Sequence, residues 1–150
     1  MRLHRQQRLA ATMVECAVVY PVTFLLALGM IIGGLGIFRY QELSTLAREA
    51  ARYASVHGTL YAQDAGTTPP TPDDIYNAVV VPKAVALDLS QLSYQITYNT
   101  SNSPTHTIIV NKDVVAVRNT VNVKLTYQWI PEAFLGGITL SSTSEMPMSY

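Results

Sequence analysis

The sequence has little cysteine and no excess of charge of either sign. Cys16 is its single cysteine, so no disulfide can form within the chain and any domain outside a membrane must be held together by packing alone. Lys plus Arg and Asp plus Glu each total 10, which gives a formal net charge of zero. Without a basic surface, the chain is not expected to bind nucleic acid.

The residue patterns of enzymes and metal sites are also missing from the sequence. His4, His57 and His106 show no ligand spacing, and there is no Gly-rich phosphate loop or nucleophile elbow. The neighbouring acids Asp73 and Asp74 are better explained as the start of a helix than as a metal site. We therefore predict no catalytic residue, no metal, no cofactor and no small-molecule substrate.

A long apolar run fills much of the N-terminal part of the chain. From Cys16 to Phe38 every residue is apolar, Gly, Pro or an uncharged Thr or Tyr. As a helix rising about 1.5 Å per residue, this run is long enough to cross a hydrocarbon core of about 30 Å. A cleaved secretory signal would have a shorter apolar core, of about 7 to 15 residues. The run therefore predicts one helix that spans a lipid bilayer.

The charges beside this run predict its orientation. Arg2, Arg5 and Arg8 precede it with no acid among them, whereas a mixture of arginines and glutamates follows it between Arg39 and Arg52. This distribution favours a cytoplasmic N-terminus, with the C-terminal part on the far side of the cytoplasmic (inner) membrane. Apolar residues continue at helical spacing beyond Phe38 until Gly58, so the helix is expected to leave the bilayer unbroken; they are Leu43, Leu46, Ala47, Ala50 and Ala54.

Glu15 is an acid inside the otherwise nearly apolar stretch from Leu9 to Phe38. A carboxylate in a membrane helix costs about 2.5 to 3.5 kcal/mol on insertion scales, so it is usually retained for a partner. Two readings remain open. Glu15 meets a positive group of another molecule, or it lies at the cytoplasmic interface and reaches the water.

Pro21 and three glycines are further features of this helix. Pro21 is tolerated in a membrane helix and predicts a kink above Glu15. Gly29 and Gly33 form a Gly-x-x-x-Gly pair, with Gly36 on nearly the same face. Such a face allows another helix to approach closely, although glycine is also common in membrane helices without a partner.

The remaining sequence predicts an α+β protein with a small antiparallel sheet. The expected segments are a basic leader at 1–10, the membrane and emerging helix at 11–57, a loop and short helix at 58–90, and a β domain at 91–150. Gln63 to Pro72 is expected to be a loop, and Thr71 to cap a short helix that ends near Val81 before Pro82. Its predicted buried face consists of Ile75, Ala78 and Val79.

Alternating apolar and polar residues predict the strands. The first covers Leu92 to Tyr98, a loop follows from Asn99 to Thr105, and Thr107 to Val110 is expected to pair back as a short strand before a turn at 111–113. The longest strand covers Asn119 to Trp129. Its predicted inward residues are Val121, Val123, Leu125, Tyr127 and Trp129. A last strand from Ile138 is expected at a sheet edge, because Pro147 cannot donate a ladder hydrogen bond.

The stretch from Leu9 to Glu15 resembles a type IV prepilin signal, in which a basic leader is cut four residues before a glutamate. The implied cut falls between Ala10 and Ala11, with Ala10 where most such signals have Gly. More specifically, the chain resembles the TadE family, the minor pseudopilins of the tight-adherence pilus. Val14-Glu15 is followed by Pro21 and an apolar run to Gly29, and the family's Arg-Glu…Arg-Tyr segment is matched by Arg48, Glu49, Arg52 and Tyr53. Ile32 and Leu35 stand where that family often has an intramembrane acid and arginine.

The resemblance implies a membrane subunit that takes part in the assembly of tight-adherence type IVb pili. Its partners would be a prepilin peptidase, other pilins or pseudopilins and the Tad assembly platform. The cut would free an amine on Ala11 that pairs with Glu15 of an adjacent subunit and fixes their register. The alternative from another class is a membrane-tethered binding module whose helix is only an anchor. An anchored enzyme would need a site that the sequence does not contain.

Overall fold

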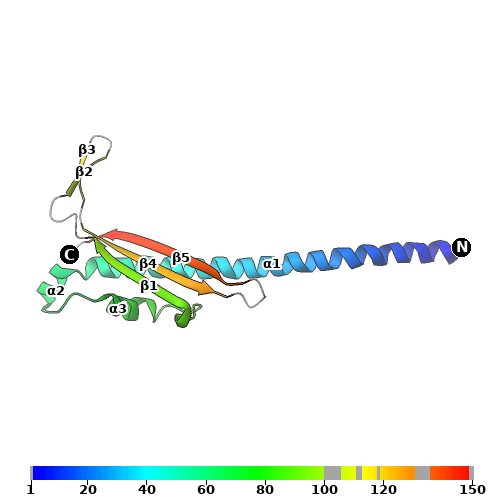
Figure 1. Ribbon diagram of the computed structural model, residues 1–150, viewed down its shortest axis with the longest axis horizontal. Coiled ribbons are helices and arrows are strands. Elements are labelled where there is room, and N and C mark those ends of the chain that lie inside the picture. Colours follow the sequence, from blue (N-terminus) through cyan, green and yellow to red (C-terminus); the bar gives the residue numbers. More distant parts are fainter. Residues whose placement is uncertain (1, 100–105, 111–112, 118, 131–135, 149–150) are drawn as a thin grey trace. The chain divides into compact units, whose positions relative to one another are not determined.

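The computed structural model describes residues 2–99, 106–110, 113–117, 119–130 and 136–148, with side chains described for 13–58, 61–99, 119–130 and 136–148. The chain divides into two compact units, Met1–Ile37 and Phe38–Tyr150. Figure 1 shows their elements.

The first unit is the N-terminal part of helix α1, which runs from Arg2 to Val56 with Pro21 inside it. Among the described residues, this is the one helix long and apolar enough to cross a membrane. Most side chains from Met13 to Ile37 are exposed, as expected for a helix whose apolar surface meets lipid rather than a protein core. The prediction that the helix continues without a break beyond Phe38 is confirmed.

The second unit begins with the last part of α1, which supplies one wall of its core. Leu43, Leu46, Ala47, Ala50 and Ala54 are all buried, as their spacing predicts. Four of the buried positions in this stretch are alanines, which add Ala51 to the predicted set. Alanine keeps a helix stable and leaves little bulk on its surface, which suits a helix face that is buried in a core.

Helix α1 ends at Val56, two residues before Gly58, and Gly58 is the N-cap residue of a second helix. Helix α2 runs from Thr59 to Ala65, so the prediction of a loop from Gln63 is wrong for Gln63 to Ala65. The stop is Gly66, whose φ of 65° is a left-handed conformation that glycine adopts without strain. Its N–H and that of Thr67 donate to carbonyls of the last turn of α2.

The short helix before Pro82 begins as predicted. Helix α3 covers Pro72–Ile75, and Thr71 forms a capping box with Asp74. The Thr71 N–H and hydroxyl donate to Asp74 Oδ2 at 2.9 and 2.7 Å, and the Asp74 N–H donates to Thr71 Oγ1 at 3.2 Å. These bonds favour the ionised carboxylate and hold the pKa of Asp74 below its usual value.

The helix then widens into the π-helix η1, Tyr76–Val80, which corrects the predicted buried face. Ile75 and Val79 are buried as predicted, but Ala78 is exposed and Val80 is buried instead. The Val81 N–H donates to the Tyr76 carbonyl, a bond that spans five residues. Because a π-turn takes more residues than an α-turn, positions 79 and 80 both rotate toward the core.

The central sheet contains β1 (Leu92–Asn99), β4 (Thr120–Trp129) and β5 (Ile138–Pro147), preceded by the 3-10 turn η2, Leu89–Gln91. All pairs are antiparallel, with β4 between the other two, as Figure 1 shows. The five predicted inward residues of β4 are all buried, and β5 lies at an edge as predicted. The α+β fold class is therefore confirmed.

Strand β2 (His106–Val110) forms a separate hairpin with β3 (Asp113–Val117), a strand that the sequence analysis does not predict. A strand does form at Thr107 to Val110, but the prediction that it pairs back onto the preceding strand is wrong, because its partner is β3. Every residue of β1, from Leu92↔Tyr127 to Asn99↔Thr120, is paired with β4 instead. Strand β3 is also close to β2 in the sequence. The loop predicted at 99–105 lies outside the described residues from 100 onward, as do 111 and 112 of the predicted turn.

Contacts of two tyrosines connect the helical segment formed by α3 and η1 to the sheet. The rings of Tyr76 on η1 and Tyr94 on β1 stack with centroids 4.2 Å apart, and the Tyr94 hydroxyl donates to Asp73 Oδ1. Donation to that carboxylate raises the pKa of Tyr94, and burial raises the pKa of Tyr76. Two elements that lie well apart in the sequence are thereby joined without a disulfide.

Candidate functional site

Glu15 lies in the first unit with its side chain exposed on the surface of α1. In the described part of the chain, the one ion pair is between Lys83 and Glu49, so Glu15 has no cation there. Ala10 and Ala11 also lie within α1, one turn before Glu15, and their side chains are outside the described set. An unpaired carboxylate on an apolar helix surface is a group that a second molecule can satisfy.

The glycines share a side of the helix with Glu15. At 3.6 residues per turn, Glu15, Gly29, Gly33 and Gly36 fall within about 60° of one another around α1. A Cβ added at Gly29 or Gly33 would meet no atom of the chain within 4 Å. Packing within the chain therefore does not require glycine here, although each glycine costs a helix about 0.5 to 1 kcal/mol relative to alanine.

Pro21 lies between Glu15 and these glycines, inside the continuous helix. Proline lacks the N–H that would bond to the carbonyl four residues earlier. Two residues on, the Thr23 hydroxyl donates to the Val19 carbonyl at 2.8 Å. This bond adds to the backbone bonding of the turn, but the carbonyl that Pro21 leaves without its helical N–H partner is that of Ala17.

The four residues of the predicted family motif lie on the last part of α1, in the second unit. Glu49 forms the ion pair with Lys83, and Tyr53 stacks on His57 with ring centroids 4.0 Å apart. Arg48 and Arg52 are exposed, and Arg48 donates to Thr45 Oγ1 at 3.3 Å. Two members of the motif therefore hold neighbouring parts of the chain, and the two arginines face solvent.

Arg39 has a structural role that sequence reasoning did not identify. Its guanidinium donates to the Tyr127 hydroxyl at 2.9 Å and lies 5.6 Å from the centre of the Trp129 ring and 5.9 Å from that of Tyr127. Both distances are within the range of cation–π attraction. Arg39 thus attaches the beginning of the second unit to the end of β4. Arg39 is the first charged residue after the apolar run, which marks it in the sequence. Its role could not be predicted, because its partners Tyr127 and Trp129 are far away in the sequence.

Glu42 also binds a distant segment. Its Oε1 accepts hydrogen bonds from the Val85 and Ala86 N–H groups at 2.8 and 3.0 Å, while its Oε2 is buried without a partner. An open groove beside it is lined by residues of α1, among them Phe38 and Leu46, and by Lys83 from the segment after η1. A carboxylate that accepts two backbone N–H bonds holds the loop after η1 against the helix.

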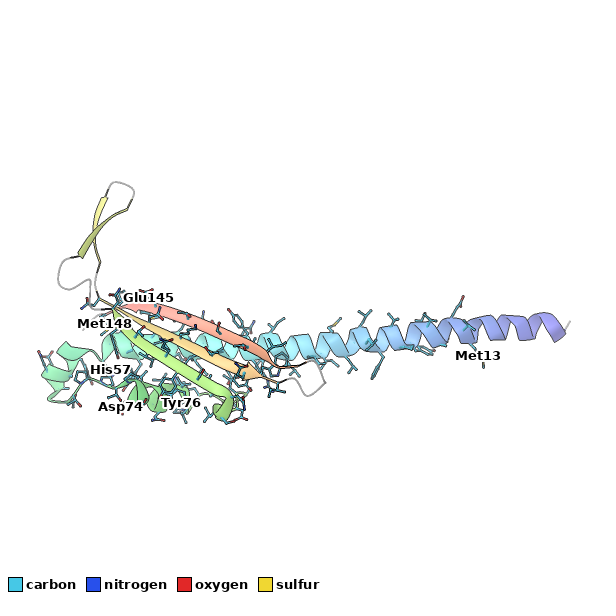
Figure 2. All side chains as sticks on the ribbon, viewed as in Figure 1. Met13, His57, Asp74, Tyr76, Glu145 and Met148 are labelled. Carbon is cyan, nitrogen blue, oxygen red and sulfur yellow. The ribbon has the colours of Figure 1, made fainter. Side chains whose placement is uncertain are left out.

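A small cavity of about 210 Å³ lies at the other end of β4. It is lined by His57, Tyr98, Met148 and two prolines, among others; His57 and Met148 are marked in Figure 2. Asn119 Oδ1 and Thr120 Oγ1, from two further lining residues, are buried without a partner. Burial raises the pKa of Tyr98, which keeps its hydroxyl neutral. The described lining residues contain no nucleophile–base pair and offer hydrogen bonding and apolar contact.

No group of three or more His, Cys, Asp or Glu that could hold a metal ion is found where the structure describes the chain. The chemically distinctive features are therefore the exposed Glu15 beside a glycine face in the first unit and the contacts of Arg39, Glu42 and Glu49 in the second. Both lie on α1. They can direct how this helix meets lipid, its own domain and other chains.

Comparison with known proteins gives one match. The family model described as TadE-like protein matches residues 10–52, the part of the chain that contains Glu15, Pro21 and the Arg-Glu…Arg segment up to Arg52. No curated protein and no solved structure matched the chain. The match covers less than half of the chain and relates this segment to a family of pilus-assembly components. Residues 10–52 are thus a TadE-like segment, which confirms the resemblance that the sequence predicts.

Proposed function

We propose that this chain is a minor pilin-like subunit, a pseudopilin, that takes part in the assembly of tight-adherence type IVb pili. The observation that carries the proposal is Glu15, an exposed carboxylate on an apolar helix inside the TadE-like segment, with no cation among the side chains that the structure describes. A carboxylate in such surroundings is expected to be retained for an intermolecular contact.

The proposed mechanism begins with a cut by a prepilin peptidase between Ala10 and Ala11. The cut removes the basic leader and leaves a positive amine on Ala11. In the assembled state this amine pairs with Glu15 of an adjacent subunit in apolar surroundings. Such a pair adds little net stability, but a subunit in the wrong register leaves a charge unpaired at a cost of several kcal/mol, on the order of 3 to 5.

The glycine face supports the same contact. Because Gly29, Gly33 and Gly36 lie on the side of α1 that carries Glu15, a neighbouring helix that meets Glu15 can also approach the backbone closely. Pro21 between them allows a bend that adjusts this approach. The second unit, from Phe38 onward, is then presented on the extracytoplasmic side of the cytoplasmic membrane.

The competing function is a tethered binding module, and the cavity lined by His57 and Tyr98 is the observation that favours it. In that case α1 would be only an anchor, so its sequence would be interchangeable with that of another single-pass helix.

A chimera separates the two functions. Residues 11–37 are replaced by an unrelated membrane-spanning helix of equal length, with 1–10 and 38–150 unchanged, in source cells that lack their own copy. We expect the chimera to reach the membrane in normal amount but not to restore surface pili, because it lacks Glu15 and the glycine face. The unmodified chain, supplied at the same level, is the control. Full restoration by the chimera would favour the tethered module.

A further inference from the structure

Apolar side chains are exposed together at one end of the second unit. We call this group the apolar rim. Its members are Phe38 (57% exposed), Tyr40 (47%), Val85 (89%), Leu89 (39%), Ile130 (66%) and Ile138 (45%). Single exposed apolar residues are ordinary on a soluble surface, but a group of six at one end indicates contact with an apolar medium or partner.

Specific contacts bring these six residues from four chain segments to the same end. Phe38 and Tyr40 flank Arg39, whose guanidinium bonds to the Tyr127 hydroxyl and lies over Trp129. Ile130 follows Trp129, and Ile138 pairs with Trp129 in the sheet. The Asp88 N–H donates to the same Tyr127 hydroxyl at 3.4 Å, which places Leu89 nearby. The bond from Val85 to Glu42 places Val85 within about one turn of Phe38.

This end of the unit is also the point at which the chain leaves its apolar segment. Phe38 is the last residue of the apolar run, and it is joined directly to Ile37 of the first unit. Whatever the angle between the units, residues in contact with Arg39 therefore lie close to the membrane surface when α1 spans the bilayer. Tyr40, which follows Arg39 and is exposed, suits that surface, because tyrosine favours the headgroup region.

We propose that the apolar rim rests in the headgroup region of the extracytoplasmic leaflet, so that lipid covers Val85 and Ile130 while the subunit is in the membrane. Lipid is favoured over a second copy because the adjacent apolar run already holds the rim at the bilayer surface. The rim then limits the tilt of the domain on its helix.

The test is a fluorescent label that reports contact with lipid. Cys16 is replaced by alanine and a single cysteine is introduced at Val85 (V85C), which carries a nitrobenzoxadiazole dye. The full chain is reconstituted in vesicles of phosphatidylcholine and phosphatidylglycerol at low protein density. The matched control is Thr97→Cys, an exposed position on β1. It pairs with Asn122, away from the rim end of the sheet.

We expect the label at position 85 to emit at shorter wavelength than the label at position 97 and to be quenched by lipids with a shallow nitroxide. Adding Ile130→Ser should weaken that quenching, because it removes apolar area from the same rim. Equal spectra at the two positions would overturn the proposal. So would a short-wavelength signal without lipid quenching, since another part of the chain would then cover Val85. A short-wavelength signal that appears only at high protein density would show that a second copy of the chain, and not lipid, covers Val85.

The inference rests on the membrane span and not on the proposed pilin role. The labelled chain needs neither cleavage nor assembly, so a negative result would leave the proposed function untouched. Conversely, loss of the pilin role would not change the expected spectra.

Discussion

Glu15→Leu is expected to abolish incorporation of the subunit into the pilus or its base while leaving its insertion into the membrane intact. Leucine removes a charge that costs about 2.5 to 3.5 kcal/mol to place in a bilayer, so insertion should if anything improve. Assembly should fail because the Ala11 amine of a neighbouring subunit then has no carboxylate in apolar surroundings. The measurement is the amount of the chain in sheared pili and in the isolated assembly complex, compared with the amount in the membrane.

Val14→Leu is the matched control for this experiment. It introduces the same side chain one residue earlier, at another exposed position of α1, and keeps the carboxylate. Glu15→Asp, which keeps the charge on a shorter side chain, should retain more incorporation than Glu15→Leu. Incorporation of Glu15→Leu at the level of Val14→Leu would show that the carboxylate has no role between subunits.

Leu43→Ala is expected to destabilise the second unit by about 2 to 5 kcal/mol, the range for truncation of a fully buried leucine. Leu43 is 0% exposed, although it lies on the same helix as the membrane segment. Alanine favours the helix at least as well as leucine, so the loss comes from packing in the core. The measurement is denaturant unfolding of the full chain in detergent micelles, followed through the fluorescence of Trp129, the single tryptophan.

Arg48→Ala serves as the reference for that measurement. Arg48 is exposed on the same part of α1, so its replacement should change the free energy of unfolding by no more than about 0.5 kcal/mol. If Leu43→Ala were no less stable than Arg48→Ala, the end of α1 would not be part of the core. The helix would then be a stalk that only carries the domain.

Periodicity was sufficient to predict the elements with a buried face. The spacing from Leu43 to Ala54 and the alternation from Val121 to Trp129 each reflect a single repeated geometry, helix or strand, against a core. Thr71 predicted a helix start because its hydroxyl and the Asp74 carboxylate satisfy N–H groups within four residues of each other. In each case, local chemistry and burial favour the same structure.

The failures have a different origin. The buried Val80 and exposed Ala78 follow from a π-turn, and nothing in the pattern of apolar residues marks where a helix widens. Helix α2 begins directly after Gly58, so the glycine that predicted a stop also preceded a new start. The partner of β2 was misassigned because a short apolar strand fits several neighbours, and pairing is decided by which strand lies nearest with a matching register.

The candidate site residues divide in the same way. Glu15 could be proposed from the sequence because a charge inside a membrane-spanning run is costly. Arg39 and Glu42 could not, since their meaning depends on Tyr127 and on the Val85 and Ala86 backbone, more than 40 residues away. The apolar rim was likewise hidden, because its six members come from four segments that only the fold brings together.

The account depends most on the cut between Ala10 and Ala11, which creates the amine that Glu15 is proposed to meet. Intact-mass and N-terminal analysis of the chain purified from membranes of its source cells measures this directly. The account predicts a mature protein that begins at Ala11 and lacks the three leader arginines. A protein that begins at Met1 or Arg2 would contradict it, because the only cation proposed to meet Glu15 would not exist.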